Sequence, residues 1–292
     1  MPYLILLDKP EGITSFRAVS EVKKRLGIKR VGHTGTLDPM ATGVLPLLTG
    51  RASRLSSMML ESDKRYTATV RLGITTDTLD ITGNVLEEKP VQVSDEELEK
   101  ALEHFRGEQS QLPPMYSALK KDGVRLYDLA RQGIEIEREP RQIVIKELNL
   151  IERINDTDFI IDVLCSKGTY IRSLAQDIGE YLGVGATLTA LRRTAVSGFS
   201  IEDCITLDDV FEGSPKLKSA EECVKHLTAI NVSEAQATRF KNGGQLDLQR
   251  IKNLKDPTHD QLLRVRSADR FLGIGRVDIE NQRIDIACII EE

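Results

Sequence analysis

The pattern of apolar and polar positions along the chain predicts a series of strands. Strict alternation within residues 64–73 places four side chains on one side of a strand: Tyr66, Ala68, Val70 and Leu72. Apolar runs and further alternation predict strands over residues 3–7, 43–48, 141–154, 158–165 and 187–191. Residues 75–85 and the proline-containing segment 111–123 are expected to be irregular.

Helical spacing of apolar residues predicts the helices. Ser94 and Glu97 form a capping-box pattern for a helix that runs through Phe105. The segment 168–183 is expected to be an amphipathic helix whose apolar stripe contains Ile171, Leu174, Ala175, Ile178 and Leu182. Shorter helices are expected over residues 16–26, up to about 60, 124–132 and 233–241.

Strands and helices do not alternate regularly along the chain. We therefore expect an α+β fold with a mixed sheet rather than a doubly wound parallel one. After an acidic stretch over residues 202–222, the pattern changes to a short helix, a glycine pair and several short strands. A domain junction is expected near residue 228.

Composition limits the class of protein. A chain of 292 residues can bury a sizeable core, and no apolar run approaches the roughly 20 residues of a membrane span. We expect a cytoplasmic protein with no membrane association. The four cysteines are scattered without a CxxC pair, so we expect reduced thiols and no metal site.

Charge is unevenly distributed, although the formal net charge is −5. Residues 1–54 carry nine basic and four acidic side chains, whereas residues 87–108 carry three basic and eight acidic ones. A basic segment of this kind allows an acidic protein to hold a polyanion on one face. Two ordinary solvated faces would give the same pattern, so charge alone leaves both interpretations open.

Asp38 is the first candidate for chemistry. It lies in GHTGTLDPMATGVL, where glycines at 32 and 35 permit a tight backbone and Pro39 keeps Asp38 out of the helical region. The carboxylate could face a cleft, or it could cap its own turn. The motif is unlike aspartyl-phosphate loops, in which the acid precedes TGT, and no GxxxxGK[ST] loop is present.

Glycosyl transfer is the template that a lone carboxylate fits best. A carboxylate can attack or stabilise an oxocarbenium-like sugar. A hydrolase normally needs a second carboxyl group to activate water, but an isomerase that rejoins the same base to the same sugar does not. Asp38 alone could therefore serve an isomerase.

Arg172 is the second candidate. With Thr169 as the expected N-cap, Arg172 falls in the first turn of its helix, where the helix dipole disfavours a cation. A buried carboxylate partner would explain its position. A surface arginine that extends into solvent is the alternative.

The motif around Asp38 resembles the signature of the TruB family, the bacterial tRNA pseudouridine-55 synthases. Five other segments resemble that family in the same order, and together they cover about residues 3–210: LDKPEGITS, KRYTATVRLG, QLPPMYSALKKDGVRLYDLARQG, CSKGTYIRSLAQDIGEYLG and LRRTAVSGF. The resemblance implies that uridine 55 in the tRNA T-loop is isomerised to pseudouridine without a cofactor, metal or energy source.

The resemblance also implies a role for each candidate residue. Asp38 would be the catalytic carboxylate, and Arg172 would pair with it. Tyr66 would lie against the flipped base and assist loss of the carbon-5 proton. His33 would fill the space beside the flipped nucleotide, and Leu191 would line the pocket. Without the resemblance, Tyr66 and Leu191 are typical core residues, and His33 is typical of a histidine held within its own turn.

The resemblance extends the expected architecture. It implies a mixed, largely antiparallel sheet of the pseudouridine synthase type with flanking helices, in a catalytic domain over residues 1–228. An RNA-gripping insertion is expected over about 116–146 with Lys120, Lys121, Arg125 and Arg131. A small, mostly-β, PUA-like RNA-binding domain is expected over residues 229–292. Phe16 departs from the polar residue expected there in some members of the family, which affects the expected local RNA contacts and not the chemistry.

Two alternatives share these motifs. A guide-RNA-dependent synthase subunit would carry strongly basic tails and a larger RNA-binding module, whereas this chain is acidic with a compact C-terminal segment. A non-catalytic tRNA-binding or folding module would have been free to lose Asp38, Tyr66 or Arg172, and all three are present. We expect a monomeric enzyme that acts on the tRNA T-arm with no obligatory protein partner.

Overall fold

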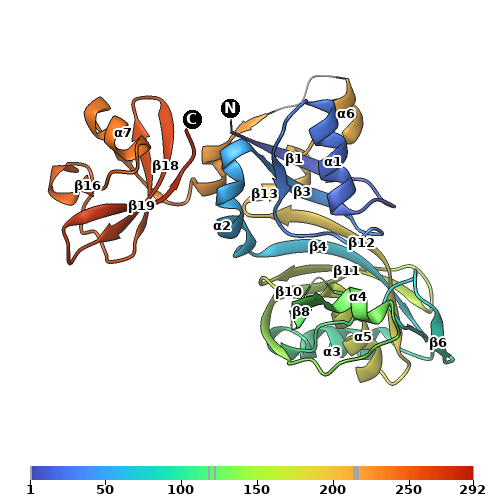
Figure 1. Ribbon diagram of the computed structural model, residues 1–292. Helices are drawn as coiled ribbons and strands as arrows, with labels where there is room; N and C mark the ends of the chain where they lie inside the picture. Colours follow the sequence, from blue (N-terminus) through green and yellow to red (C-terminus); the bar gives the residue numbers. More distant parts are fainter. Residues whose placement is uncertain (1, 118, 122, 213–216, 292) are drawn as a thin grey trace.

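The computed structural model describes residues 2–117, 119–121, 123–212 and 217–291. Within these residues, a ten-stranded mixed sheet forms the centre of the molecule and a separate five-stranded sheet forms its C-terminal part (Figure 1). About the centre of the larger sheet, β12 and β4 separate the elements β1, β3 and α1 from the elements β10, β11, α3 and α5.

The order of the main path through the large sheet is β14-β1-β3-β12-β4-β11-β10-β7, with β2 paired to β3 and β13 to β12. The pairings are antiparallel except for the short parallel contact of β12 with β3. The α+β fold with a mixed, largely antiparallel sheet is therefore confirmed. The strands are β1 (Tyr3–Lys9), β2 (Val31–His33), β3 (Thr42–Thr49), β4 (Lys64–Leu72), β7 (Gly107–Gln111), β10 (Arg141–Arg153), β11 (Asp158–Cys165), β12 (Ala186–Val196), β13 (Phe199–Ser200) and β14 (Lys218–Ser219).

The alternation predicted for β4 is present. Tyr66, Ala68, Val70 and Leu72 are buried, and the residues between them are partly exposed. In the neighbouring β12, Leu191 pairs with Ala68. Because directly paired residues of antiparallel strands share a face, Leu191 and Tyr66 lie on the same side of the sheet.

Helices cover that face. The longer ones are α1 (Ser15–Arg25), α3 (Asp95–His104) and α5 (Ile171–Tyr181). Thr14 caps α1, and the predicted capping box of Ser94 and Glu97 begins α3. Apolar side chains of all three helices share one core with Tyr66 and Ala68. The remaining helical segments before the C-terminal part are η1 (Gly50–Leu55), α2 (Ser56–Leu60), α4 (Leu126–Ala130), η2 (Ile201–Asp203), α6 (Leu207–Phe211) and η3 (Ala220–Val224).

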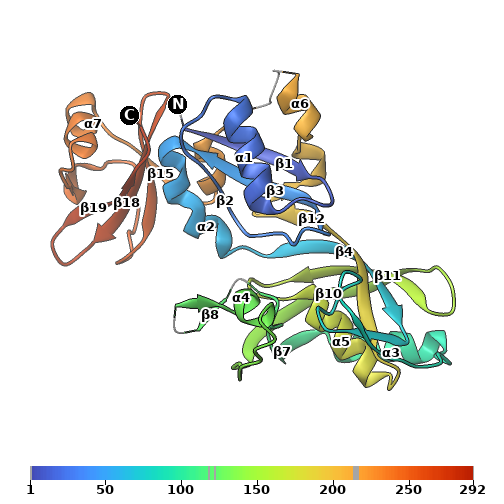
Figure 2. The same ribbon diagram turned by 45° about the vertical axis from the view of Figure 1, so that its right-hand side comes forward.

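The opposite face of the sheet packs against the C-terminal part. Leu4, Leu6 and Leu48 share a second core with Ile274 and Ile290. The C-terminal sheet has the order β15-β17-β18-β19-β16, and Figure 2 shows it beside α2, away from α4 and α5. Its elements are β15 (Thr228–Asn231), α7 (Glu234–Lys241), β16 (Leu246–Asp247), η4 (Leu248–Arg250), β17 (Leu262–Ser267), β18 (Arg270–Asp278) and β19 (Arg283–Ile289). The expected small, mostly-β C-terminal domain is present.

Three local predictions were wrong. The segment 75–85 was expected to be a loop, but its ends belong to the antiparallel pair β5 (Ile74–Thr76) and β6 (Val85–Glu88), because threonine and valine favour extended backbone. The helix expected over 124–132 is confined to α4 and is preceded by the pair β8 (Lys120–Lys121) and β9 (Val124–Arg125). Tyr170, not Thr169, occupies the N-cap of α5, since the Thr169 hydroxyl donates to the Ser166 carbonyl instead.

Candidate active site

Asp38 lies in the loop between β2 and β3, and that loop is fixed from outside. The Ser15 hydroxyl at the start of α1 accepts from the Leu37 amide at 2.9 Å and donates to the Leu37 carbonyl at 3.0 Å. On the other side of Asp38, the Pro39 carbonyl accepts from the Gly12 amide at 2.8 Å. The two residues that flank Asp38 are therefore anchored to the segment that leads into α1.

Arg172 makes the ion pair that its position in the helix suggested. Its Nη2 lies 2.9 Å from Asp38 Oδ2, and its side chain is only 5 % exposed, against 38 % for Asp38. The guanidinium also donates to the carbonyls of Thr78 at 2.9 Å and Tyr116 at 2.7 Å. These acceptors offset the unfavourable interaction between the Arg172 cation and the dipole of α5, which is positive at the first turn of the helix.

Asp80 is part of the same cluster, and sequence reasoning missed it. Its Oδ2 lies 3.5 Å from Arg172 Nη1, and its side chain is 6 % exposed. Its Oδ1 accepts from the hydroxyls of Thr78 and Thr82 and from the Thr82 amide. The run Thr-Leu-Asp-Ile-Thr was a usable signal, because threonines two residues on either side of an aspartate can satisfy its carboxylate within a turn.

The surroundings of Asp38 disfavour the ionised form of its carboxyl group. Desolvation raises the pKa of the Asp38 carboxyl above its usual range, the Arg172 guanidinium opposes that rise, and the Asp80 charge adds to it. Lys9 is the other nearby cation. It is fully buried, and its Nζ donates to the carbonyls of Pro10, Ile13 and Pro39. Burial lowers the pKa of Lys9 to about 8, although the Asp38 charge counteracts the effect.

The other predicted site residues belong to the sheet and to the start of the Asp38 loop. Tyr66 and Leu191 lie on the helix-covered face of β4 and β12, and they are 7 % and 9 % exposed. Burial raises the pKa of the Tyr66 hydroxyl, so the neutral phenol is favoured in the resting site. His33 ends β2 at the start of the Asp38 loop, and within the described residues its buried Nδ1 has no hydrogen-bond partner.

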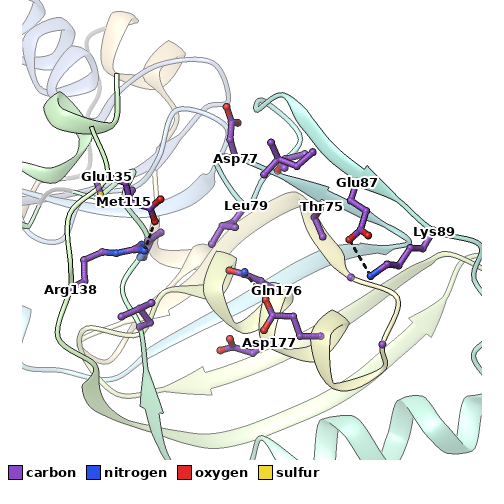
Figure 3. A pocket seen from close by; sticks show the side chains of 17 residues that line it. Thr75, Asp77, Leu79, Glu87, Lys89, Met115, Glu135, Arg138, Gln176 and Asp177 are labelled. Carbon is purple, nitrogen blue, oxygen red and sulfur yellow. Dashed lines mark hydrogen bonds and ion pairs between the residues drawn. The ribbon is translucent and has the colours of Figure 1, made fainter. Parts of the chain in front are cut away.

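A cavity of about 700 Å³ lies next to this cluster, between the turn that carries Leu79 and helix α5 (Figure 3). Its lining includes Met115, Arg138, Gln176 and Asp177 but not Asp38. Leu79 follows Thr78, whose carbonyl accepts from Arg172. The cavity thus lies beyond the turn that holds Asp80, and Asp38 is not part of its wall.

Asp177 in that cavity should make stability depend on pH. Burial, with the nearby Glu180 charge, raises its pKa to about 6. Between its unfolded pKa of about 4 and this value, the unfolded chain loses the proton while the folded chain retains it, so stability falls as pH rises. We expect Asp177→Asn to increase the free energy of unfolding by about 1–2 kcal/mol at pH 7.5, a value reduced for solvent screening of a half-buried group, and to leave it nearly unchanged at pH 4.

Urea unfolding of both proteins at the two pH values measures the difference. An equal gain at pH 4 and pH 7.5 would show that the charge of Asp177 is not its cause.

Family models match nearly the whole chain. Residues 23–171 match the model described as "TruB family pseudouridylate synthase (N terminal domain)". Residues 172–227 match "tRNA pseudouridylate synthase B C-terminal domain", and residues 228–284 match "Pseudouridine synthase II TruB, C-terminal". The first match contains Asp38 and Tyr66, and the second begins at Arg172.

Curated relatives are similar over almost their full length. The chain is 47 % identical to tRNA pseudouridine synthase B of Azoarcus sp. (strain BH72), over 93 % of this chain and 90 % of the relative. It is 44 % identical to the protein of the same name from Chromobacterium violaceum, over 93 % and 89 % of the two chains.

Among solved structures, a chain of the "Crystal Structure of a Cbf5-Nop10-Gar1 Complex" is similar with a TM-score of 0.73 and 27 % identity. The alignment covers 99 % of this chain and 84 % of that one. A chain of the "Structure of H/ACA RNP bound to a substrate RNA containing 2'-deoxyuridine" has the same TM-score at 24 % identity and shares the fold.

Proposed function

The chain belongs to the TruB family of pseudouridylate synthases, and on this premise we propose that it converts uridine 55 in the T-loop of tRNA to pseudouridine. The family makes it an isomerase. Support for tRNA as its substrate comes from relatives 43–47 % identical, all named tRNA pseudouridine synthase B. The observation that supports Asp38 as the acting group is its ion pair with a buried arginine in a loop held on both sides.

The reaction breaks the C1′–N1 and C5–H bonds and forms the C1′–C5 and N1–H bonds. The C1′–N1 glycosidic bond of uridine breaks, the uracil turns, C1′ bonds to C5, the C5 proton leaves and N1 gains a proton. Product and substrate are isomers, so the overall balance requires no redox partner or energy source. Asp38 would act on the reacting nucleotide as the carboxylate that permits cleavage.

The site residues divide these tasks. Arg172 would keep the Asp38 carboxylate ionised and in position. Tyr66 and Leu191, on the same face of the neighbouring strands β4 and β12, would contact the flipped base. Because flipping costs unpairing and unstacking, new contacts with the extruded nucleotide must offset it. His33, at the start of the Asp38 loop, would occupy space beside that nucleotide.

We assign catalysis to residues 1–228 and further RNA contact to the PUA-like residues 229–292. Within the insertion 116–146, residues 118 and 122 lie outside the described part of the chain. Its four proposed phosphate contacts all belong to exposed residues: Lys120, Lys121, Arg125 and Arg131. Exposed cations on a short projecting segment suit the backbone of a folded RNA.

Lys120→Gln should weaken tRNA binding in a salt-dependent manner. Loss of one phosphate contact is expected to reduce the slope of log K against log salt by about 0.7–0.9. The matched control is Lys100→Gln, which removes an exposed lysine from the acidic helix α3. Filter binding of tRNA between low and moderate salt measures both slopes. Equal slopes for the two variants would contradict a phosphate contact at Lys120.

The guide-dependent alternative receives support from the fold alone, through the structures of complexes with Cbf5. The sequence is more similar to the relatives named tRNA pseudouridine synthase B, at 43–47 % identity, than to the chains of those complexes, at 25–27 % identity. We therefore propose that the chain acts as a monomer in the cytoplasm, where tRNA is found, with no obligatory protein partner.

The deciding experiment is tritium release from an unmodified tRNA transcript labelled at carbon 5 of its uridines, with the isolated chain and no added RNA, protein, metal or nucleotide. Release limited to one uridine per tRNA, and lost when uridine 55 is replaced by cytidine, is the expected result. Release that appears only with an added guide RNA would favour the alternative. Binding without release under all conditions would favour a non-catalytic module.

A further inference from the structure

Arg193 is a buried cation of the site to which the foregoing assigns no role. It is the largest of the fully buried side chains in the described residues, with 1 % exposure. It lies two residues after Leu191 in β12, so it shares the face of the sheet that carries Leu191 and Tyr66. A buried guanidinium loses its hydration, so polar groups of the protein must compensate for that loss.

Neutral acceptors hold the Arg193 guanidinium. Its Nε donates to the Val44 carbonyl at 2.8 Å, and its Nη2 donates to the Gly35 carbonyl at 3.1 Å. Within the described residues, no carboxylate lies within ion-pair distance of it. Gly35 and Val44 stand on either side of Asp38 in the chain, so Arg193 ties both ends of the catalytic loop to β12.

The backbone at Arg193 leaves little freedom for the side chain to move. A Cβ added at Gly43 would lie 2.2 Å from the Arg193 carbonyl oxygen, so β3 and β12 approach closely at this point. A Cβ at Gly35 would lie 3.4 Å from Arg193 Nη1. Gly35 and Gly43 both have positive φ, of 76° and 103°, which suits glycine. The position of the guanidinium is thus fixed by the motif that carries Asp38.

Tyr66 is the neighbour on which this charge acts. Arg193 and Tyr66 are directly paired across β12 and β4, and both are buried. Burial raises the pKa of the Tyr66 hydroxyl, and the Arg193 cation is the largest influence that opposes the rise. The same cation lowers the pKa of His33 and of Lys64, so its field extends across this side of the site.

We propose that Arg193 is a positioning residue for Tyr66, and that its fixed positive charge stabilises the Tyr66 oxygen as an anion during the loss of the C5 proton. The proposal rests on the proposed function. For Tyr66 to act as the base that removes the C5 proton, its phenol first releases its own proton to solvent. After C1′ has bonded to C5, the phenolate oxygen takes the C5 proton, and the electron pair of that C–H bond returns to the ring. The cation is preorganised for the charge that develops.

Two substitutions separate charge from loop anchoring. Arg193→Lys keeps the cation but loses the paired contacts with Gly35 and Val44. Arg193→Gln keeps an amide donor but loses the cation. With tRNA carrying hydrogen or deuterium at C5 of uridine 55, we expect Arg193→Gln to turn over about 10-fold or more slowly and to show a larger isotope effect than wild type. Arg193→Lys should retain an isotope effect close to that of wild type.

A purely structural role would give a different result. If Arg193 only anchored the loop, both variants would lose activity or thermal stability without a change in the isotope effect, and the proposal would be overturned. Equal isotope effects in the Lys and Gln variants would overturn it as well. Failure of the wild-type chain to form pseudouridine would instead refute the proposed function.

The Tyr66→Phe background supplies a second readout. If Arg193 acts through the Tyr66 oxygen, adding Arg193→Gln to Tyr66→Phe should cost much less activity than it costs in the wild-type chain. Independent, multiplying losses in the double variant would contradict the proposal. Thermal unfolding and tRNA binding of each variant identify any loss that is due to misfolding.

Discussion

Asp38→Asn is expected to reduce pseudouridine formation about 10⁴-fold or more and to leave the fold and tRNA binding intact. Asparagine keeps the shape of the side chain but has neither the negative charge nor the nucleophilicity of the carboxylate. Arg172 retains Asp80 and the carbonyls of Thr78 and Tyr116 as acceptors, so the buried guanidinium keeps its main partners. Single-turnover tritium release and tRNA affinity, measured side by side, test the two halves of this expectation.

The matched control for Asp38→Asn is Asp156→Asn, which changes an exposed aspartate in the turn between β10 and β11. The control should retain wild-type turnover and binding. Loss of tRNA binding together with activity in Asp38→Asn would count against the separation of scaffold and chemistry. Appreciable residual turnover would show that another group can replace the carboxylate.

Arg172→Ala is expected to reduce both activity and stability. The substitution leaves the carboxylates of Asp38 and Asp80 close together without their cation and removes two hydrogen bonds to backbone carbonyls. Breaking a buried pair by removing one partner costs about 3–5 kcal/mol, and the partial exposure of Asp38 favours the lower end of that range. Loss of a preorganised charge should lower kcat by about 100-fold or more. Thermal and urea unfolding, with kcat measured at saturating tRNA, test the two effects.

Arg172→Lys provides the comparison. It keeps a positive charge near Asp38, but one ammonium group cannot reproduce the fork that reaches both carboxylates and both carbonyls. Its losses should therefore be smaller than those of the alanine variant. Unchanged unfolding in Arg172→Ala would disprove the energetic part of the ion-pair argument.

The sequence predicted the helices and strands that carry the site residues better than it predicted which of those residues contact one another. The alternation around Tyr66 and the capping box at Ser94 are local patterns, and both are present in the structure. The position of Arg172 in a first turn pointed to a carboxylate, and the ion pair with Asp38 is there. The roles proposed for these residues in catalysis stay predictions.

Asp80, Lys9 and Arg193 were missed for a common physical reason. Each contacts a segment distant in the chain: Lys9 donates to the Pro39 carbonyl, Arg193 donates to the Val44 carbonyl, and Asp80 lies against Arg172 of α5. In the sequence, Lys9 and Arg193 look like ordinary surface cations, because burial of a charge depends on what packs over it. Thr169 failed as a cap because its hydroxyl found the Ser166 carbonyl instead.

The core that joins Leu4, Leu6 and Leu48 to Ile274 and Ile290 has a consequence for the boundary near residue 228. Arg51 and Arg54 reinforce that contact by donating to the carbonyls of Glu291 and Ile289. β1 and β3 pack into the helix-covered core with one face and into this shared core with the other. The C-terminal part is therefore not a detachable accessory. A shortened chain would expose the apolar reverse side of the strands that position the Asp38 loop, because Ile274 and Ile290 would no longer cover it.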